Sequence, residues 1–156
     1  MPRYRVCKTF TVESGHMLSK HPGSCRIPHG HTRTIELVVS AEELDQNDMV
    51  VDFKVLSMIA ADHINRYDHA MALNSNDPLR ADIERIHPGG TIVFQDQDPT
   101  TEVLAKSIYD FVKDKLESGF EGNCSRGNTY SVEPNRVKLE KVRVSETPSS
   151  WAEYGI

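Results

Sequence analysis

Two stretches of alternating apolar and polar residues constrain the fold most, because a period of two is typical of β-strands with one buried face. The first stretch covers residues 3–14 and the second covers residues 32–41. Apolar side chains recur at even positions of the first stretch and at odd positions of the second: Tyr4, Val6, Phe10 and Val12, then Ile35, Leu37 and Val39. The pattern predicts two strands whose apolar faces point into one core.

Three histidines extend these two inward faces. The parity of the first stretch places His16 inward, and counting back by twos from Ile35 through Arg33 places His31 and His29 inward as well. Three imidazoles with an open fourth position are typical of catalytic zinc, whereas structural zinc sites are usually closed by cysteines. Neutral imidazole also binds nickel, copper and iron, so the histidines predict a metal site and zinc is inferred.

Two further groups are candidates for acid–base chemistry. Cys25 lies four residues before His29, and a thiol near a cation can serve as thiolate base, as nucleophile or as fourth metal ligand. A ligand role would make the site closed and structural. The dipeptide Asp68-His69 could be a proton shuttle, because a carboxylate fixes the tautomer of an imidazole and raises its basicity. Polar residues are common at helix ends, which is the alternative explanation for this pair.

Glu146 shares the parity of Val142 and Val144, which predicts an inward carboxylate at the end of a strand. A buried glutamate is costly unless it is paired, and a planar ligand edge with two N–H donors would pair it. The alternative is a strand-end glutamate that turns to solvent. Thr101 and Glu102 begin a predicted helix after Pro99, a place where proline and an acidic residue are both favourable.

A chain of 156 residues suits one domain, and we expect residues 1–156 to form it. The order of elements is strand-strand-helix-helix-strand-strand, which predicts an α+β fold: an antiparallel four-stranded sheet with two helices on one face. The edges of such a small sheet need covering, which favours oligomerisation. Beyond the first two strands, the elements expected are a helix over 53–66, a strand at 91–94, a helix from 98–102 onward, a strand at 129–132 in a 119–135 loop, and strands at 136–146 and 150–154.

Composition narrows the function further. The net charge is -5 and the Lys and Arg residues form no cluster with aromatic residues, which argues against a nucleic-acid surface. The sequence has no signal-peptide pattern and no apolar run of membrane-spanning length, so we expect a cytoplasmic protein. Cys7, Cys25 and Cys124 are odd in number and widely spaced, unlike a disulfide framework. Cys7 is expected to be a packed strand residue.

Six short motifs follow one another along nearly the whole chain: Phe10-Thr11-Val12-Glu13-Ser14-Gly15-His16, Cys25-x-x-x-His29-Gly30-His31, Val50-Val51-Asp52-Phe53, Tyr67-Asp68-His69, Pro99-Thr100-Thr101-Glu102 and Val144-Ser145-Glu146-Thr147. In this order they resemble the 6-pyruvoyl-tetrahydropterin synthase family. The cysteine spacing and the Glu146-Thr147-Pro148 ending are most similar to its bacterial and archaeal 6-carboxytetrahydropterin synthase branch, which acts in 7-deazaguanine (queuosine) biosynthesis.

The resemblance implies the tunnelling fold, assembled as a homohexamer of two stacked trimeric barrels with active sites at subunit interfaces. It implies a Zn²⁺ cofactor and a pterin triphosphate, 7,8-dihydroneopterin triphosphate, as substrate. The roles it implies are these: His16, His29 and His31 as zinc ligands, Cys25 as base, Asp68 and His69 as a second proton-transfer pair, Glu146 as anchor of the pterin ring, and Thr101 and Glu102 near the pterin pocket. The carboxy branch would release acetaldehyde and triphosphate, whereas the pyruvoyl branch only eliminates triphosphate.

The chain departs from the family pattern at three places. Gly15 stands where alanine or serine is frequent, Arg33 stands where an aromatic residue is common, and the connection over residues 119–135 is longer than usual. Two readings from other classes remain beside the synthase: a three-histidine zinc hydratase or hydrolase, and a non-catalytic zinc- or pterin-binding protein.

Overall fold

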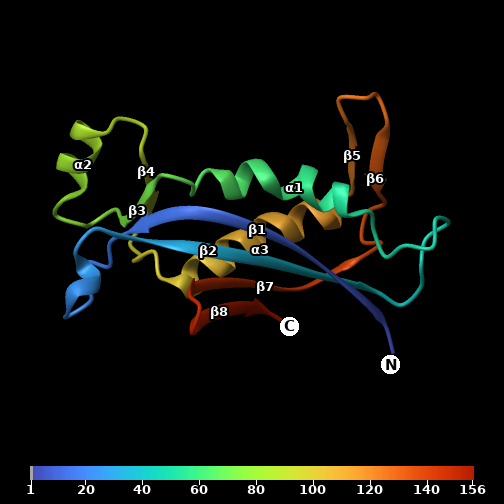
Figure 1. Ribbon diagram of the computed structural model, residues 1–156, viewed down its shortest axis with the longest axis horizontal. Coiled ribbons are helices and arrows are strands. Elements are labelled where there is room, and N and C mark those ends of the chain that lie inside the picture. The colour runs from blue at the N-terminus through green and yellow to red at the C-terminus, as the bar shows by residue number, and fades with distance from the viewer. Residues whose placement is uncertain (1) are drawn as a thin grey trace.

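A curled six-stranded sheet of mixed direction is the centre of the computed structural model, which describes residues 2–156 (Figure 1). The strand order is β4-β3-β1-β2-β7-β8. The strands of this sheet are β1 (Tyr4–His16), β2 (His29–Ala41), β3 (Met71–Asn74), β4 (Thr91–Phe94), β7 (Lys138–Thr147) and β8 (Ser150–Gly155).

The long hairpin of β1 and β2 confirms the two predicted strands and extends both toward the histidines. The two strands pair antiparallel in one unbroken register, from Tyr4 opposite Ala41 to His16 opposite His29. Strand β7 continues the antiparallel sheet beside β2, and β8 follows beside β7. The side chains at the even positions of β1 become fully buried toward its end, as at Val12 and His16.

Helices α1 (Phe53–Asn65) and α3 (Thr101–Ser118) cover one face of the sheet, as expected. Asp52 caps α1 by accepting a hydrogen bond from the Lys54 N–H, and Thr100 caps α3 in the same way from Val103. The buried stripes of both helices join the inward residues of β1, β2 and β7 in a single aliphatic core, which includes Leu56, Ile59, Ala60, Ile64, Leu104, Ile108 and Val112.

The expectation of a four-stranded, entirely antiparallel sheet with only two helices is wrong. Strand β3 pairs parallel with the end of β1, and β4 pairs parallel with β3. A third helix, α2 (Arg80–Ile86), lies between these strands in the sequence. Strand β3 has only four residues, too few to show a period of two, and none of the α2 residues is buried. Neither element therefore carries a periodic signal in the sequence.

The 119–135 segment is a hairpin rather than a loop with one strand. Strand β5 (Phe120–Asn123) pairs with the predicted strand β6 (Thr129–Val132) in a separate two-stranded sheet. Figure 1 shows this hairpin projecting away from the main sheet.

The expectation that Cys7 is packed is also wrong. Its side chain is exposed, because odd-numbered positions of β1 face outward.

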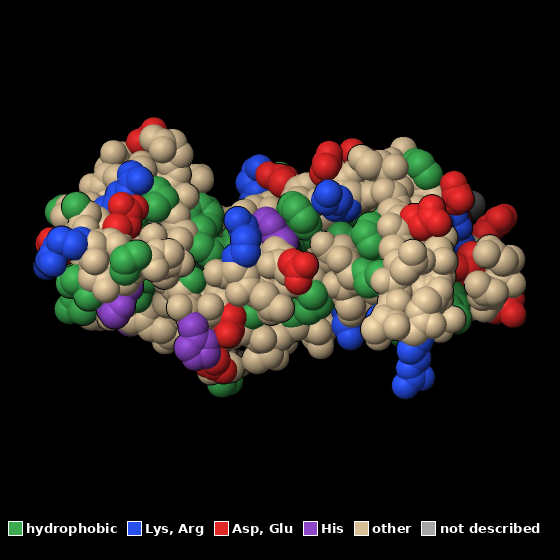
Figure 2. All heavy atoms as spheres, turned by 90° about the horizontal axis from the view of Figure 1, so that it is seen from above, with side chains coloured by type: hydrophobic (Ala, Val, Ile, Leu, Met, Phe, Trp, Pro, Cys, Tyr) green, Lys and Arg blue, Asp and Glu red, His purple; other side chains and the backbone are tan. Residues whose placement is uncertain are grey.

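Acidic and basic side chains alternate over the face drawn in Figure 2 and do not gather into a basic patch there. None of the helices within residues 2–156 combines the length and apolar character needed to span a membrane.

Candidate metal centre

Three imidazoles meet where β1 ends and β2 begins. His16 lies directly opposite His29 in the strand register, and His31 follows on the same face of β2. The ring centroids are 4.5 Å apart for His16 and His29 and 5.1 Å apart for the other two pairs. One nitrogen from each ring lies within 4.8 Å of the other two. The convergence expected from strand parity is confirmed, and the three side chains could hold a metal ion.

The hydrogen bonds of the rings leave the Nε2 atoms of His29 and His31 free. The Nδ1 atoms of His16 and His29 lie 2.8 Å from the Pro99 carbonyl and 2.7 Å from the Ile27 carbonyl. A carbonyl only accepts, so each Nδ1 carries the proton and each Nε2 keeps its lone pair. Within residues 2–156, the buried Nε2 atoms of His29 and His31 have no hydrogen-bond partner. Buried polar atoms are rarely left unpaired, and a metal ion would satisfy both.

Burial favours the neutral, metal-binding form of His16 and His31. It lowers the pKa of His16 to about 4, and the positive charge of Arg33 acts in the same direction. Burial also lowers the pKa of His31, as does Arg33, while the Glu146 carboxylate acts against the shift. Because a metal ion competes with protons for imidazole, a lowered pKa favours metal binding at neutral pH.

A pocket of about 320 Å³ adjoins the triad. Four residues predicted from the sequence line it: Cys25, Thr101, Glu102 and Glu146. Glu146 connects the pocket with the histidines, since its Oε1 lies 3.5 Å from Nε2 of His31 and 3.7 Å from Nε2 of His16. The Thr101 hydroxyl donates to the same oxygen over 3.3 Å. The inward direction expected for Glu146 is the one observed.

A buried carboxylate fixes the loop that carries Cys25. Cys25 belongs to a short 3-10 turn, Ser24–Arg26, and its backbone carbonyl accepts a hydrogen bond from the Leu18 N–H. Asp98 accepts hydrogen bonds from the Ser19 hydroxyl at 2.6 Å and the Lys20 N–H at 2.8 Å. Asn74 in β3 donates a third at 3.0 Å. Burial acts to raise the pKa of Asp98, but these hydrogen bonds outweigh it and the pKa is lowered.

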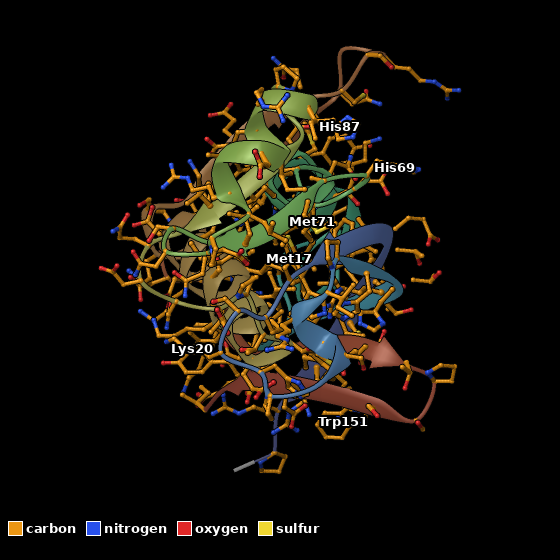
Figure 3. All side chains as sticks on the ribbon, turned by 90° about the vertical axis from the view of Figure 1, so that its left-hand side faces the viewer. Met17, Lys20, His69, Met71, His87 and Trp151 are labelled. Atoms are coloured by element: carbon orange, nitrogen blue, oxygen red, sulfur yellow. The ribbon has the colours of Figure 1, made fainter. Side chains whose placement is uncertain are left out.

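Asp68 and His69 form the expected pair outside this pocket. Nδ1 of His69 lies 2.9 Å from Oδ2 of Asp68, and Oδ1 of Asp68 accepts the Glu13 N–H at 2.8 Å. The hydrogen bond that His69 donates to Asp68 raises the pKa of His69, while the Glu13 N–H and His69 lower the pKa of Asp68. The His69 side chain is 79% exposed. Figure 3 shows it well apart from Trp151, which lines the pocket.

Sequence reasoning missed three residues at this centre. Trp151 of β8 lines the pocket, and the Arg143 guanidinium lies 3.6 Å from its ring centroid. The sequence feature that could have indicated it is that Trp151 is the one tryptophan of the chain. His21, in the loop between β1 and β2, also lines the pocket. Arg33 was placed inward by parity but given no task.

Comparisons with known proteins agree with this architecture. The 6-pyruvoyl tetrahydropterin synthase family profile matches residues 5–155. A 6-carboxy-5,6,7,8-tetrahydropterin synthase of Aquifex aeolicus is 30% identical, over 97% of this chain and 98% of its own length. The protein with the same name from Bacillus subtilis is also 30% identical, over 97% of this chain and 84% of its own length.

Two solved structures share the fold. An uncharacterised protein of Wolinella succinogenes superposes with a TM-score of 0.76 at 21% identity, covering 99% of both chains. A 6-pyruvoyl tetrahydropterin synthase of Caenorhabditis elegans superposes with a TM-score of 0.64 at 18% identity, covering 100% of this chain and 97% of its own. By the match of its sequence over nearly its full length, the chain belongs to the 6-pyruvoyl tetrahydropterin synthase family.

Proposed function

We propose that this protein is a zinc-dependent lyase that converts 7,8-dihydroneopterin triphosphate and one water molecule to 6-carboxy-5,6,7,8-tetrahydropterin, acetaldehyde and triphosphate. The observation that carries the proposal is the adjacency of a three-histidine centre to a pocket lined by Cys25 and Glu146. The names of the full-length relatives favour the carboxy product. The reaction would belong to 7-deazaguanine (queuosine) biosynthesis.

His16, His29 and His31 would hold the zinc through their Nε2 atoms, since two of the rings give Nδ1 to backbone carbonyls. When bound, zinc supplies a Lewis acid that makes the hydroxyls of the substrate side chain more acidic. Cys25, as thiolate, removes a proton from that side chain. The Asp98 hydrogen bonds keep the Cys25 loop against the start of α3 and so fix where this base stands.

Glu146 would anchor the pterin ring. An ionised carboxylate can accept two parallel hydrogen bonds from an amino group and an adjacent ring N–H, a strong and directional contact. Its Oε1 already accepts from Thr101, which fixes the carboxylate at the pocket wall. Glu102 lines the same wall one residue further along α3 and would contact the substrate beside Glu146.

Asp68 and His69 would act on a neighbouring subunit's substrate. The pair is exposed and does not line the pocket of its own chain, whereas proton transfer needs hydrogen-bond contact. A homohexamer with shared sites would bring the pair to a second pocket. Both outer strands of the sheet, β4 and β8, offer edges for such an assembly.

The test is product analysis. Zinc-loaded protein and 7,8-dihydroneopterin triphosphate are expected to yield one acetaldehyde per triphosphate, measured by hydrazone formation and mass spectrometry. Cys25→Ala, with unchanged zinc content, is the matched control and should release no acetaldehyde. Triphosphate release without acetaldehyde would instead identify the pyruvoyl branch.

Two outcomes would identify a different class of protein. Zinc that requires Cys25 for tight binding, with no turnover, would make the centre structural and the protein a non-catalytic zinc- or pterin-binding one. Turnover of another substrate that survives Cys25→Ala would favour a three-histidine hydratase or hydrolase acting through metal-bound hydroxide.

A further inference from the structure

A fully buried arginine lies beside the metal centre and has no part in the chemistry described so far. Arg33 follows His31 by two residues on the same face of β2, and only 1% of its surface is exposed. Its guanidinium is a permanent charge with five donors and no acceptor. Burying such a group is costly unless its donors are paired, so its partners indicate what it holds in place.

The guanidinium joins the elements that build the pocket. Nε donates to the Ser14 hydroxyl of β1 at 2.9 Å. Nη1 donates to the Thr101 hydroxyl of α3 at 3.0 Å and to the Ser145 carbonyl of β7 at 3.3 Å. Nη2 lies 3.4 Å and 3.5 Å from the two ring nitrogens of His16. The Arg33 side chain therefore contacts Thr101, which donates to Glu146, and Ser145, which precedes Glu146. It also contacts His16 of the candidate metal centre.

The direction of the hydrogen bonds follows from the chemistry of arginine. Because a guanidinium cannot accept, the Thr101 oxygen must accept from Arg33. The Thr101 hydroxyl proton is then free for Oε1 of Glu146, 3.3 Å away. Glu146 thus receives a hydrogen bond whose direction Arg33 fixes. Among residues 2–156 Arg33 forms no direct ion pair with Glu146, so Thr101 is the connection between them.

The backbone at Glu146 is irregular, and Arg33 stabilises it. The pairing of β7 with β8 is interrupted between Ser145 and Thr147, a bulge that contains Glu146. Bulges near active sites commonly redirect a side chain. The Ser145 hydroxyl accepts the Thr34 N–H at 2.7 Å, and the Ser145 carbonyl is taken by Arg33. The hydroxyl and the carbonyl of Ser145, the residue before Glu146, are therefore both held by β2.

We propose that Arg33 is a positioning residue that aims the Glu146 carboxylate at the pterin ring, acting through the Thr101 hydroxyl and the Ser145 carbonyl. This inference rests on the proposed function, since it deepens the role of Glu146 as substrate anchor. An aromatic residue at this position could fill the space but could not donate to two elements at once. Lysine carries the charge with its three donors on a single nitrogen, so it lacks the planar fork that spreads the donors of arginine over several elements.

The experiment is a double-mutant cycle on ligand binding. Neopterin, a fluorescent pterin, is titrated into zinc-loaded native protein, Arg33→Met, Glu146→Gln and the double variant, with the zinc content of each measured. Arg33→Met is expected to weaken neopterin binding about tenfold, as for a lost hydrogen bond to a charged group. In the Glu146→Gln background it should add less than about twofold, because residues that act through one another are not additive. Arg33→Lys should restore part of the loss.

Two controls keep the test independent of folding. Arg5→Met removes an exposed guanidinium from β1 and should leave neopterin binding unchanged. If Arg33→Met does not fold, Thr101→Val interrupts the same connection without the buried charge and should reproduce the tenfold loss, whereas Thr101→Ser keeps the hydroxyl and should retain binding.

Native-like binding by Arg33→Met, or by Thr101→Val in its place, would overturn the positioning role. So would losses that simply add in the double variant. A native protein that binds zinc but not neopterin would overturn the proposed function itself, and the role of Arg33 with it.

Discussion

The histidine triad and the Asp68-His69 pair both lie near the end of β1, but they differ in burial and in the groups that surround them. The triad is internal, with His16 fully buried and its nitrogens directed at one point. The pair is external, with His69 79% exposed and hydrogen-bonded to Asp68 and to the backbone of Glu13. One chain thus contains a convergent histidine triad that could hold a metal ion and an exposed Asp-His pair that does not line the Cys25 pocket. Under the proposed function, sites shared between subunits would account for this arrangement.

The largest effect is expected from a substitution in the buried histidine triad. His31→Ala should reduce zinc affinity by more than about 100-fold, because even groups that only orient a metal ligand are worth 10–100-fold. Turnover should disappear with the metal. Zinc per chain, measured by elemental analysis after dialysis, checks the loss. His87→Ala, in a turn after α2, is the matched control; retention of tight zinc by His31→Ala would remove that histidine from the centre.

Cys25 separates metal binding from catalysis. Cys25→Ala should lower kcat by about 10²- to 10⁴-fold, the usual contribution of a positioned base, while zinc content stays the same. The reason is that the thiol lines the pocket without belonging to the cluster of nitrogens. Steady-state kinetics and elemental analysis on one preparation measure both quantities. Loss of zinc in this variant would contradict an open metal centre.

Co-expression of two inactive variants tests the Asp68-His69 pair directly. His69→Ala should lose about 10²-fold or more in kcat, as for removal of a proton-transfer group. Co-expressed with Cys25→Ala, it should regain about a quarter of native activity, since random assembly into shared sites leaves that fraction of sites intact. The two homo-oligomers mixed without exchange of subunits are the control. Activity that stays low after co-expression would mean that each chain uses its own His69.

A substitution of Asp98 tests how much the position of the Cys25 loop depends on the Asp98 hydrogen bonds. Asp98→Asn keeps the shape but weakens charge-assisted hydrogen bonds to Ser19 and Lys20, and should lower kcat about tenfold. Zinc binding should be unaffected, since no triad side chain bonds to Asp98. Hydrogen exchange at residues 18–25 should become faster in the variant. Unchanged exchange with reduced kcat would place the effect of Asp98 elsewhere.

The same contrast explains what the sequence could predict. The triad was predictable because it lies in long regular strands, where parity alone decides which way His16, His29 and His31 point. Strand β3 has four residues and helix α2 buries none of its own, so the parallel edge of the sheet left no periodic signal. Arg33 and Asp98 gain their tasks from residues more than 60 positions away in sequence, such as Thr101 and Ser19 respectively. No local pattern announces such contacts.

The smallest effect concerns the pH dependence of the external pair. The hydrogen bond that His69 donates to Asp68 raises the pKa of His69, so the imidazolium persists to higher pH than in a free histidine. Asp68→Asn removes the negative charge, and the pKa of His69 should fall back. The limb of the kcat profile that reports His69 should then move to lower pH. Titration of the His69 ring proton by NMR measures the pKa directly, with exposed His87 as internal reference. A pKa that does not move would mean that Asp68 orients the ring without altering its basicity, and a pKa that rises would contradict the charge argument, because loss of a neighbouring anion can only favour the neutral imidazole.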